Sequence, residues 1–154
     1  IRYLKESSIA FDEGISGEVL KIGSWEVLNR GNNVVILAVG SMVNKAMDIA
    51  KKLENNNMSC EVVNCRFIKP MDKHYLNDSL RNFSKIITLE EGVINGGFGE
   101  GIAAWLSDNK AKNDLLNIGL PNNFVDHGSR KVLLKEVGLD SESLTEKVLS
   151  FINS

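Results

Sequence analysis

Apolar residues occur in five short runs along the chain, and these runs predict the strands of a sheet. The run at residues 34–39 is apolar at every position, which is typical of a central strand that is covered on both faces. Each run is followed by turn-forming residues or by a change to helical spacing. The predicted strands are residues 24–29, 34–39, 60–64, 85–89 and 115–118.

Apolar residues return at intervals of three and four between and after these strands, which is the spacing of a helix face. We expect helices from Ser41, Asp72, Gly96, Ser129 and Ser143, with Ser41 and Asp72 as N-caps and with Ser143 and Glu146 as a capping-box pair. The faces expected to be buried are Val43, Ala46, Met47, Ala50 and Leu53 in the first helix, Leu76, Leu80 and Phe83 in the second, and Leu144, Val148 and Ile152 in the last.

The order of these elements predicts the fold class. The short turn at residues 30–33 predicts that the first two strands form an antiparallel hairpin. Strands that alternate with helices predict right-handed parallel crossovers for the rest. We therefore expect a three-layer α/β/α domain on a mixed, mostly parallel sheet of about five strands. Residues 1–23, which include the Gly/Ser-rich stretch 13–17, are expected to be an arm or linker before a domain at residues 24–154.

The composition excludes several classes of protein. The chain has 154 residues, 43% hydrophobic and 25% charged, and its net charge of -2 gives no basic surface for nucleic acid. It has no apolar run of the roughly 20 residues that cross a bilayer and no signal peptide, so no membrane partner is expected.

Cys60 and Cys65 are expected to be buried, reduced thiols, which suits a cytoplasmic protein. Because the chain starts at Ile1, we expect a processed protein or a piece of a longer one.

The segment from Thr88 to Gly99 is the first candidate for chemistry. It holds adjacent carboxylates, Glu90 and Glu91, followed by Asn95, Gly96 and Gly97 at the start of a predicted helix. These groups could act as an acid, a base or an anion site at the carboxyl end of a strand. The alternative, which we favour, is structural: one carboxylate caps the loop and the other meets a neighbouring domain. The glycine spacing does not match the dinucleotide-binding fingerprint.

Three further groups of residues carry weaker signals. Arg66 and Lys69 follow a strand and could bind an anion, although pairing with local carboxylates is the favoured interpretation. His127, beside Asp126, could be a base or a metal ligand, but a surface or interface role is favoured. Two cations in the arm, Arg2 and Lys5, could reach a phosphate or simply be solvated.

Several motifs are missing from the sequence. It has no phosphate-binding loop ending in Gly-Lys-Ser/Thr, no Cys/His spacing for a metal and no Gly-x-Ser-x-Gly elbow. The residues alone therefore predict a soluble α/β domain without a complete active site of its own.

Taken together, three long segments resemble one family. Residues 64–72 (NCRFIKPMD), residues 88–99 (TLEEGVINGGFG) and residues 117–140, with GLP, HGS and EVGLD in order, are similar to the corresponding stretches of 1-deoxy-D-xylulose-5-phosphate synthases, within the transketolase group. The resemblance spans roughly residues 1–152. The second segment alone would also fit other members of that group.

The resemblance implies an enzyme that joins pyruvate to glyceraldehyde 3-phosphate with loss of carbon dioxide, using thiamine diphosphate and Mg²⁺. Its product would feed isoprenoid, thiamine and pyridoxal synthesis. In the family the cofactor lies between two preceding domains, so none is expected in this chain. The last domain is expected to contact those domains, to support a homodimer and to close one side of the active-site region.

The resemblance also gives the arm a role. Residues 2–6 (RYLKE) align with the family's RYPRG, whose second arginine helps to hold the substrate phosphate, and this places Lys5 there. Leu4, Lys5 and Glu6 depart from that pattern, and lysine lacks the bidentate fork of arginine. The alternatives are a transketolase, the beta subunit of a 2-oxo-acid dehydrogenase, or a stand-alone interaction module.

Overall fold

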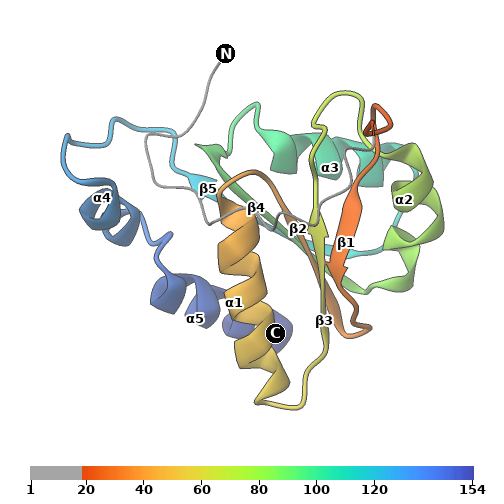
Figure 1. The fold of residues 1–154 in the computed structure, drawn as a ribbon, viewed down its shortest axis with the longest axis horizontal. Coiled ribbons are helices and arrows are strands. Elements are labelled where there is room, and N and C mark those ends of the chain that lie inside the picture. The colour runs from red at the N-terminus through yellow and green to blue at the C-terminus, as the bar shows by residue number, and fades with distance from the viewer. Residues whose placement is uncertain (1–18) are drawn as a thin grey trace.

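The computed structural model describes residues 19–154, and it confirms the predicted three-layer α/β/α fold (Figure 1). The sheet has five strands in the order β1-β3-β2-β4-β5. They are β1 (Glu26–Asn29), β2 (Val34–Ala38), β3 (Cys60–Asn64), β4 (Lys85–Val93) and β5 (Asp114–Leu120). The helices are α1 (Met42–Glu54), α2 (Lys73–Asp78), η1 (Leu80–Asn82, a 3-10 turn), α3 (Phe98–Asp108), α4 (Arg130–Glu136) and α5 (Ser141–Ile152).

The predicted hairpin between the first two strands is wrong. The first strand, β1, pairs antiparallel with β3, while β3 and β4 flank β2 in parallel. Every residue of β2 is buried, so this strand gains most from having a neighbour on each side. The short turn at residues 30–33 sets only how far apart the strands can lie, and β1 takes the free edge beyond β3.

Two apolar cores lie on opposite faces of the sheet. One face is covered by α1, α4 and α5, with Met42, Leu134 and Leu144 among its buried residues. The other is covered by α2 and α3, with Leu76 and Ile102 among its buried residues. Figure 1 shows these two groups of helices on either side of the strands.

The two cysteines lie on opposite faces of the sheet: Cys60 begins β3 and belongs to the first core, and Cys65 directly follows β3 and belongs to the second. Both are free and buried, as predicted. Burial raises the pKa of the Cys60 thiol to about 12, so the group stays protonated at neutral pH.

Two helix starts differ in detail from the prediction. Ser41 makes no side-chain cap on α1. The cap of α5 is Asp140 rather than Ser143: its Oδ1 accepts hydrogen bonds from the backbone N–H groups of Glu142 and Ser143, and its Oδ2 accepts one from Ser143 Oγ. The predicted capping-box pair is therefore wrong, because a carboxylate three residues earlier takes the capping position. Asp72 caps α2 as predicted, accepting from Tyr75 N at 2.9 Å.

The predicted boundary at residue 24 lies close to the first buried side chain. Trp25 is 8% exposed, packs on Tyr75 and Phe98, and donates from Nε1 to the carbonyl of Phe67 at 2.8 Å. Residues 1–18 lie outside the described part of the chain, so the division into an arm and a domain stays a prediction. Within residues 19–154, no helix is both long and apolar enough to cross a membrane.

Candidate functional site at the carboxyl edge of the sheet

The candidate residues gather where β2, β4 and β5 end, which we call the carboxyl edge. From β2 the chain crosses first to β3 and then back past β2 to β4, so the connections after β2 and β4 leave the sheet in opposite directions. Ligands of open α/β sheets bind at such a reversal. The pairing of β4 with β5 is irregular between Leu89 and Val93, and this irregular stretch holds both Glu90 and Glu91.

Glu90 caps helix α3. Its side chain is 7% exposed, and its two carboxylate oxygens accept hydrogen bonds from Phe98 N at 3.0 Å and Gly99 N at 2.9 Å. These N–H groups belong to the first turn of the helix, where no intrahelical acceptor exists. The prediction that one carboxylate caps the loop is confirmed. Two N–H groups that an external anion would need are already occupied by the chain's own carboxylate.

The glycines let the loop close on this carboxylate. A Cβ on Gly97 would lie 2.5 Å from Val93 O and 2.6 Å from Glu90 Oε1. Gly96 has φ +73°, which disfavours other residues, and its N–H donates to Glu100 Oε2 at 2.7 Å. Asn95 is exposed at the tip of this turn. The glycine-rich segment thus serves the loop's own geometry.

Glu91 joins the connections that follow β2 and β5. Its carboxylate accepts a hydrogen bond from Ser41 Oγ at 2.6 Å and two from Arg130, through Nε at 2.9 Å and through Nη2. This explains why Ser41 does not cap α1: its hydroxyl is directed to Glu91. The Arg130 hydrogen bonds, followed by the one from Ser41, hold the pKa of Glu91 below its ordinary value of 4.5.

A small apolar hollow lies beneath this ion pair. It measures about 260 Å³ and is lined by Glu91 and Arg130 together with apolar residues of β5, α4 and their connection, such as Leu120, Val125 and Leu133. The arginine was not among the residues predicted from the sequence. Arg130 follows the expected helix start at Ser129 directly, but no local pattern connects it with a carboxylate 39 positions earlier.

Of the remaining described candidates, Lys69 lies near this group: it is exposed and lines a hollow of about 280 Å³ together with Glu90, Gly96 and Gly97. Arg66 lies elsewhere, with its Nη1 3.4 Å from Glu26 Oε2, which confirms the favoured pairing with a local carboxylate. His127 is exposed on the connection between β5 and α4. Arg2 and Lys5 lie outside the described residues.

The described residues do not fit thiamine diphosphate or Mg²⁺. Both adjacent carboxylates are engaged, Glu90 by backbone N–H groups and Glu91 by Arg130. Within residues 19–154, no three His, Cys, Asp or Glu side chains cluster as metal ligands. The carboxyl edge is therefore a surface whose loops are held in place by the contacts of Glu90 and Glu91 within the domain.

The Glu91–Arg130 pair predicts a pH-dependent stability. Because the pKa of Glu91 is lowered on folding, its stabilisation is complete above the unfolded-state pKa and is lost as the pH falls through the folded-state pKa. We expect Arg130→Gln to cost about 1 kcal/mol at neutral pH, since the pair is partly exposed. Urea unfolding should show that the difference in the free energy of unfolding between the unaltered chain and Arg130→Gln is constant down to about pH 5 and becomes smaller below it. The exposed Arg81 provides the control: a similar narrowing in Arg81→Gln would contradict the assignment to Glu91.

Comparison with known proteins identifies the class. Residues 23–144 match the family "Transketolase, C-terminal domain", and the chain belongs to this family. Over its whole length the chain is 37% identical to the 1-deoxy-D-xylulose-5-phosphate synthase of Bacillus cereus (strain AH187), of which it spans 25%. It is 40% identical over 134 residues to the synthase of Geobacillus sp. (strain WCH70), covering 86% of the chain and 21% of that relative. The chain therefore spans about a quarter of the relatives that it matches, and the predicted resemblance is confirmed.

Solved structures agree on the fold. A split-gene transketolase, described as an inactive beta4 tetramer, superposes with a TM-score of 0.78 at 29% identity, over 92% of this chain and 46% of that one. A transketolase mutant from Pichia stipitis gives a TM-score of 0.63 at 20% identity, over 85% of this chain and 18% of that one.

Proposed function

We propose that this chain is the C-terminal domain of a 1-deoxy-D-xylulose-5-phosphate synthase. The whole enzyme would transfer the two-carbon unit left after decarboxylation of pyruvate to glyceraldehyde 3-phosphate, and so supply isoprenoid precursors in the cytoplasm. The observation that carries this proposal is the 37% identity to such synthases along the entire chain. Thiamine diphosphate and Mg²⁺ would be held by the preceding domains, and two such chains would form a homodimer.

Within that enzyme the domain acts as a support. The Glu90 cap and the Glu91–Arg130–Ser41 contacts brace three connections at one edge of the sheet. We infer that Asn95, Gly96, Gly97 and His127, beside these contacts, face the preceding domains or the second subunit near the active-site region. A rigid surface there would hold its neighbours in place without contributing a catalytic group.

The cofactor separates this role from that of an independent enzyme. We expect titration calorimetry on the 154-residue chain to show no micromolar binding of thiamine diphosphate with Mg²⁺, whereas the full-length protein binds it and consumes pyruvate with glyceraldehyde 3-phosphate. Micromolar binding by the chain alone would refute the supporting role. Full-length protein that accepts ketose phosphate donors instead of pyruvate would point to a transketolase, the second candidate that the split-gene structure favours.

The arm carries a second prediction for the full-length enzyme. If Lys5 holds the substrate phosphate, assisted by Arg2, Lys5→Ala should raise the KM for glyceraldehyde 3-phosphate by at least about tenfold, because a charge-assisted contact contributes about 1.5–3 kcal/mol. Lys5→Arg should keep or lower the KM, since arginine adds a bidentate fork. Lys21→Ala, at an exposed lysine nearer the domain, is the control. An unchanged KM in Lys5→Ala would exclude this role.

A further inference from the structure

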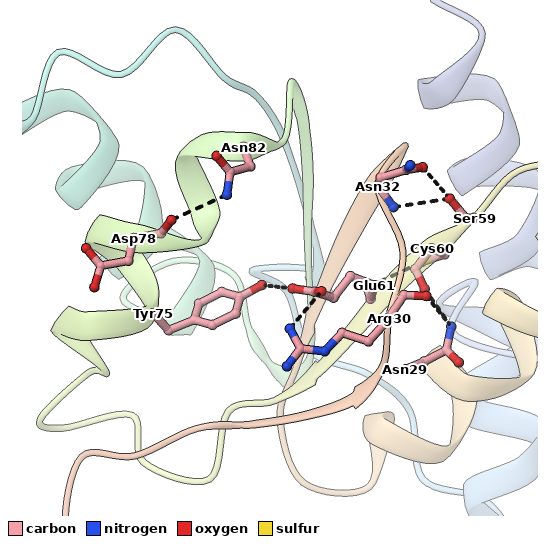
Figure 2. A network of polar contacts seen from close by, with 9 residues as sticks. All are labelled: Asn29, Arg30, Asn32, Ser59, Cys60, Glu61, Tyr75, Asp78 and Asn82. Carbon is pink, nitrogen blue, oxygen red and sulfur yellow. Dashed lines mark hydrogen bonds and ion pairs between the residues drawn. The ribbon is translucent and has the colours of Figure 1, made fainter.

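A second buried carboxylate lies at the opposite edge of the sheet, where β2, β3 and β4 begin (Figure 2). Glu61, on β3, is only 5% exposed. Its Oε1 accepts a hydrogen bond from Tyr75 OH at 2.6 Å. Its Oε2 lies 3.8 Å from Nη1 of Arg30, whose side chain is 83% exposed. Charge-assisted hydrogen bonds are normally about 2.7–2.9 Å long, so the cation stands back from the buried charge.

This arrangement is costly for stability alone. Burying a carboxylate costs several kcal/mol unless close partners replace its water, and a neutral residue of the same shape would avoid that cost. Glu90 meets the requirement with two backbone N–H groups, whereas Glu61 has one hydroxyl and a distant guanidinium. Burial, followed by the hydrogen bond to Glu61, raises the pKa of Tyr75, so its hydroxyl remains a donor to Oε1. The group left for an additional partner is Oε2.

Glu61 opens onto a hollow of about 260 Å³. One wall is the turn between β1 and β2, and the other is the segment from α2 through η1. The polar residues that line it, besides Glu61, are Arg30, Asn32, Ser79 and Asn82. A hollow of this size is smaller than the roughly 300–1,000 Å³ of pockets that hold drug-sized ligands, so it suits a small metabolite rather than a nucleotide.

The turn that forms one wall is held in place by its own contacts. Ser59 Oγ donates to Asn32 Oδ1 at 2.6 Å, and Ser59 N donates to Asn33 Oδ1 at 2.8 Å. Gly31 packs so closely on β3 that a Cβ there would lie 2.4 Å from the carbonyl carbon of Cys60. A pre-formed wall lowers the ordering cost of binding a ligand.

The two charges restrict what can bind. A simple anion near Arg30 would be repelled by Glu61, and a simple cation on Glu61 would be repelled by Arg30. A metal ion is disfavoured because the lining supplies a single carboxylate beside a cation. A ligand that carries both an ammonium and a carboxylate satisfies both groups at once.

We propose that this hollow binds a small α-amino acid, with its ammonium on Glu61 Oε2, its carboxylate on Arg30 and its side chain beside Asn32, Ser79 and Asn82. This proposal does not depend on the proposed function. It concerns the edge of the sheet opposite to the Glu90–Glu91 segment.

The test is a titration of the ¹⁵N-labelled chain, followed by NMR, with L-serine, L-asparagine and L-glutamine. Saturable shifts are expected at the amides of Gly31 and Asn82, with a Kd of about 1 mM or tighter for at least one of them. Acetate, ethanolamine and glycerol, which each lack one or both charges, should bind at least about tenfold more weakly. The same loss is expected in Glu61→Gln and Arg30→Ala, while Glu136→Gln, at an exposed carboxylate on α4, should bind as the unaltered chain does.

If Glu61→Gln does not fold, as checked by circular dichroism, Arg30→Ala decides the question, because its side chain is exposed and its loss should leave the core intact. Absence of saturable shifts with all three amino acids would overturn the proposal. So would equal affinity for acetate or ethanolamine, or unchanged affinity in Arg30→Ala.

Discussion

Replacing Glu90 with alanine is expected to destabilise the domain by about 2–4 kcal/mol. The substitution leaves the N–H groups of Phe98 and Gly99 without their acceptors inside the protein, and each unsatisfied buried donor costs about 1–3 kcal/mol. Glu90→Gln keeps the shape and one acceptor oxygen but turns an amide NH₂ toward the second N–H group. Its cost should therefore be smaller, about 1–2 kcal/mol.

Urea unfolding followed by circular dichroism measures these differences, and Glu100 provides the matched control. Glu100 also accepts a hydrogen bond from a loop glycine, Gly96 N at 2.7 Å, but at an exposed position. Glu100→Gln should therefore change the free energy of unfolding by less than about 0.5 kcal/mol. If Glu90→Ala were as mild as this control, water rather than the carboxylate would be satisfying the start of α3.

Two glycines of the same helix should respond to alanine with opposite signs. In α3, a Cβ on Gly99 would lie 2.6 Å from Thr88 Oγ1 and 2.7 Å from Asn117 Cγ, and Thr88 is fully buried. Overpacking of this kind costs about 1–3 kcal/mol. A Cβ on Gly101 would meet only Met71 Sδ, at 4.0 Å, so Gly101→Ala should stabilise the helix by about 0.5–1 kcal/mol.

Both substitutions replace a glycine of α3 with alanine, so the difference between their effects on stability reports chiefly the close packing of Gly99 on the sheet. Thermal unfolding of the two variants should place the melting temperature of Gly101→Ala above, and that of Gly99→Ala below, that of the unaltered chain. A rise in the melting temperature of both variants would mean that α3 lies farther from Thr88 and Asn117 than the structure shows.

The fold could be predicted because its strands and helices each have a local pattern of apolar and polar residues. The fully apolar stretch at residues 34–39 and the helical spacing after Ser41 both lead to buried elements where they were expected. The position of β1 could not be predicted in this way. A short turn favours a hairpin, but pairing is decided by which edge of the sheet remains free, and that depends on β3, more than 30 residues later.

In the candidate site, too, the contacts between residues close in sequence could be predicted, and those between distant residues could not. The cap by one of the two glutamates was predicted because a carboxylate before a glycine-rich helix start is a local signal. The partner of Glu91 was missed, since Arg130 approaches it only after β5 and the following connection are in place. Ser41 was assigned to a cap for the same reason: its local position suits one, but a carboxylate from another strand takes its hydroxyl.

Adjacent residues of a strand point to opposite faces of the sheet, and Glu90 and Glu91 use this alternation at the end of β4. Glu90 holds the first turn of α3 on one face, and Glu91 holds Arg130, the first residue of α4, on the other. The two outer layers are therefore fastened to the same two residues of backbone. A shift of α4 relative to the sheet would therefore act, through Arg130 and Glu91, on the end of β4 that also holds α3. The helices on the two faces of the sheet are thus coupled at the end of one strand.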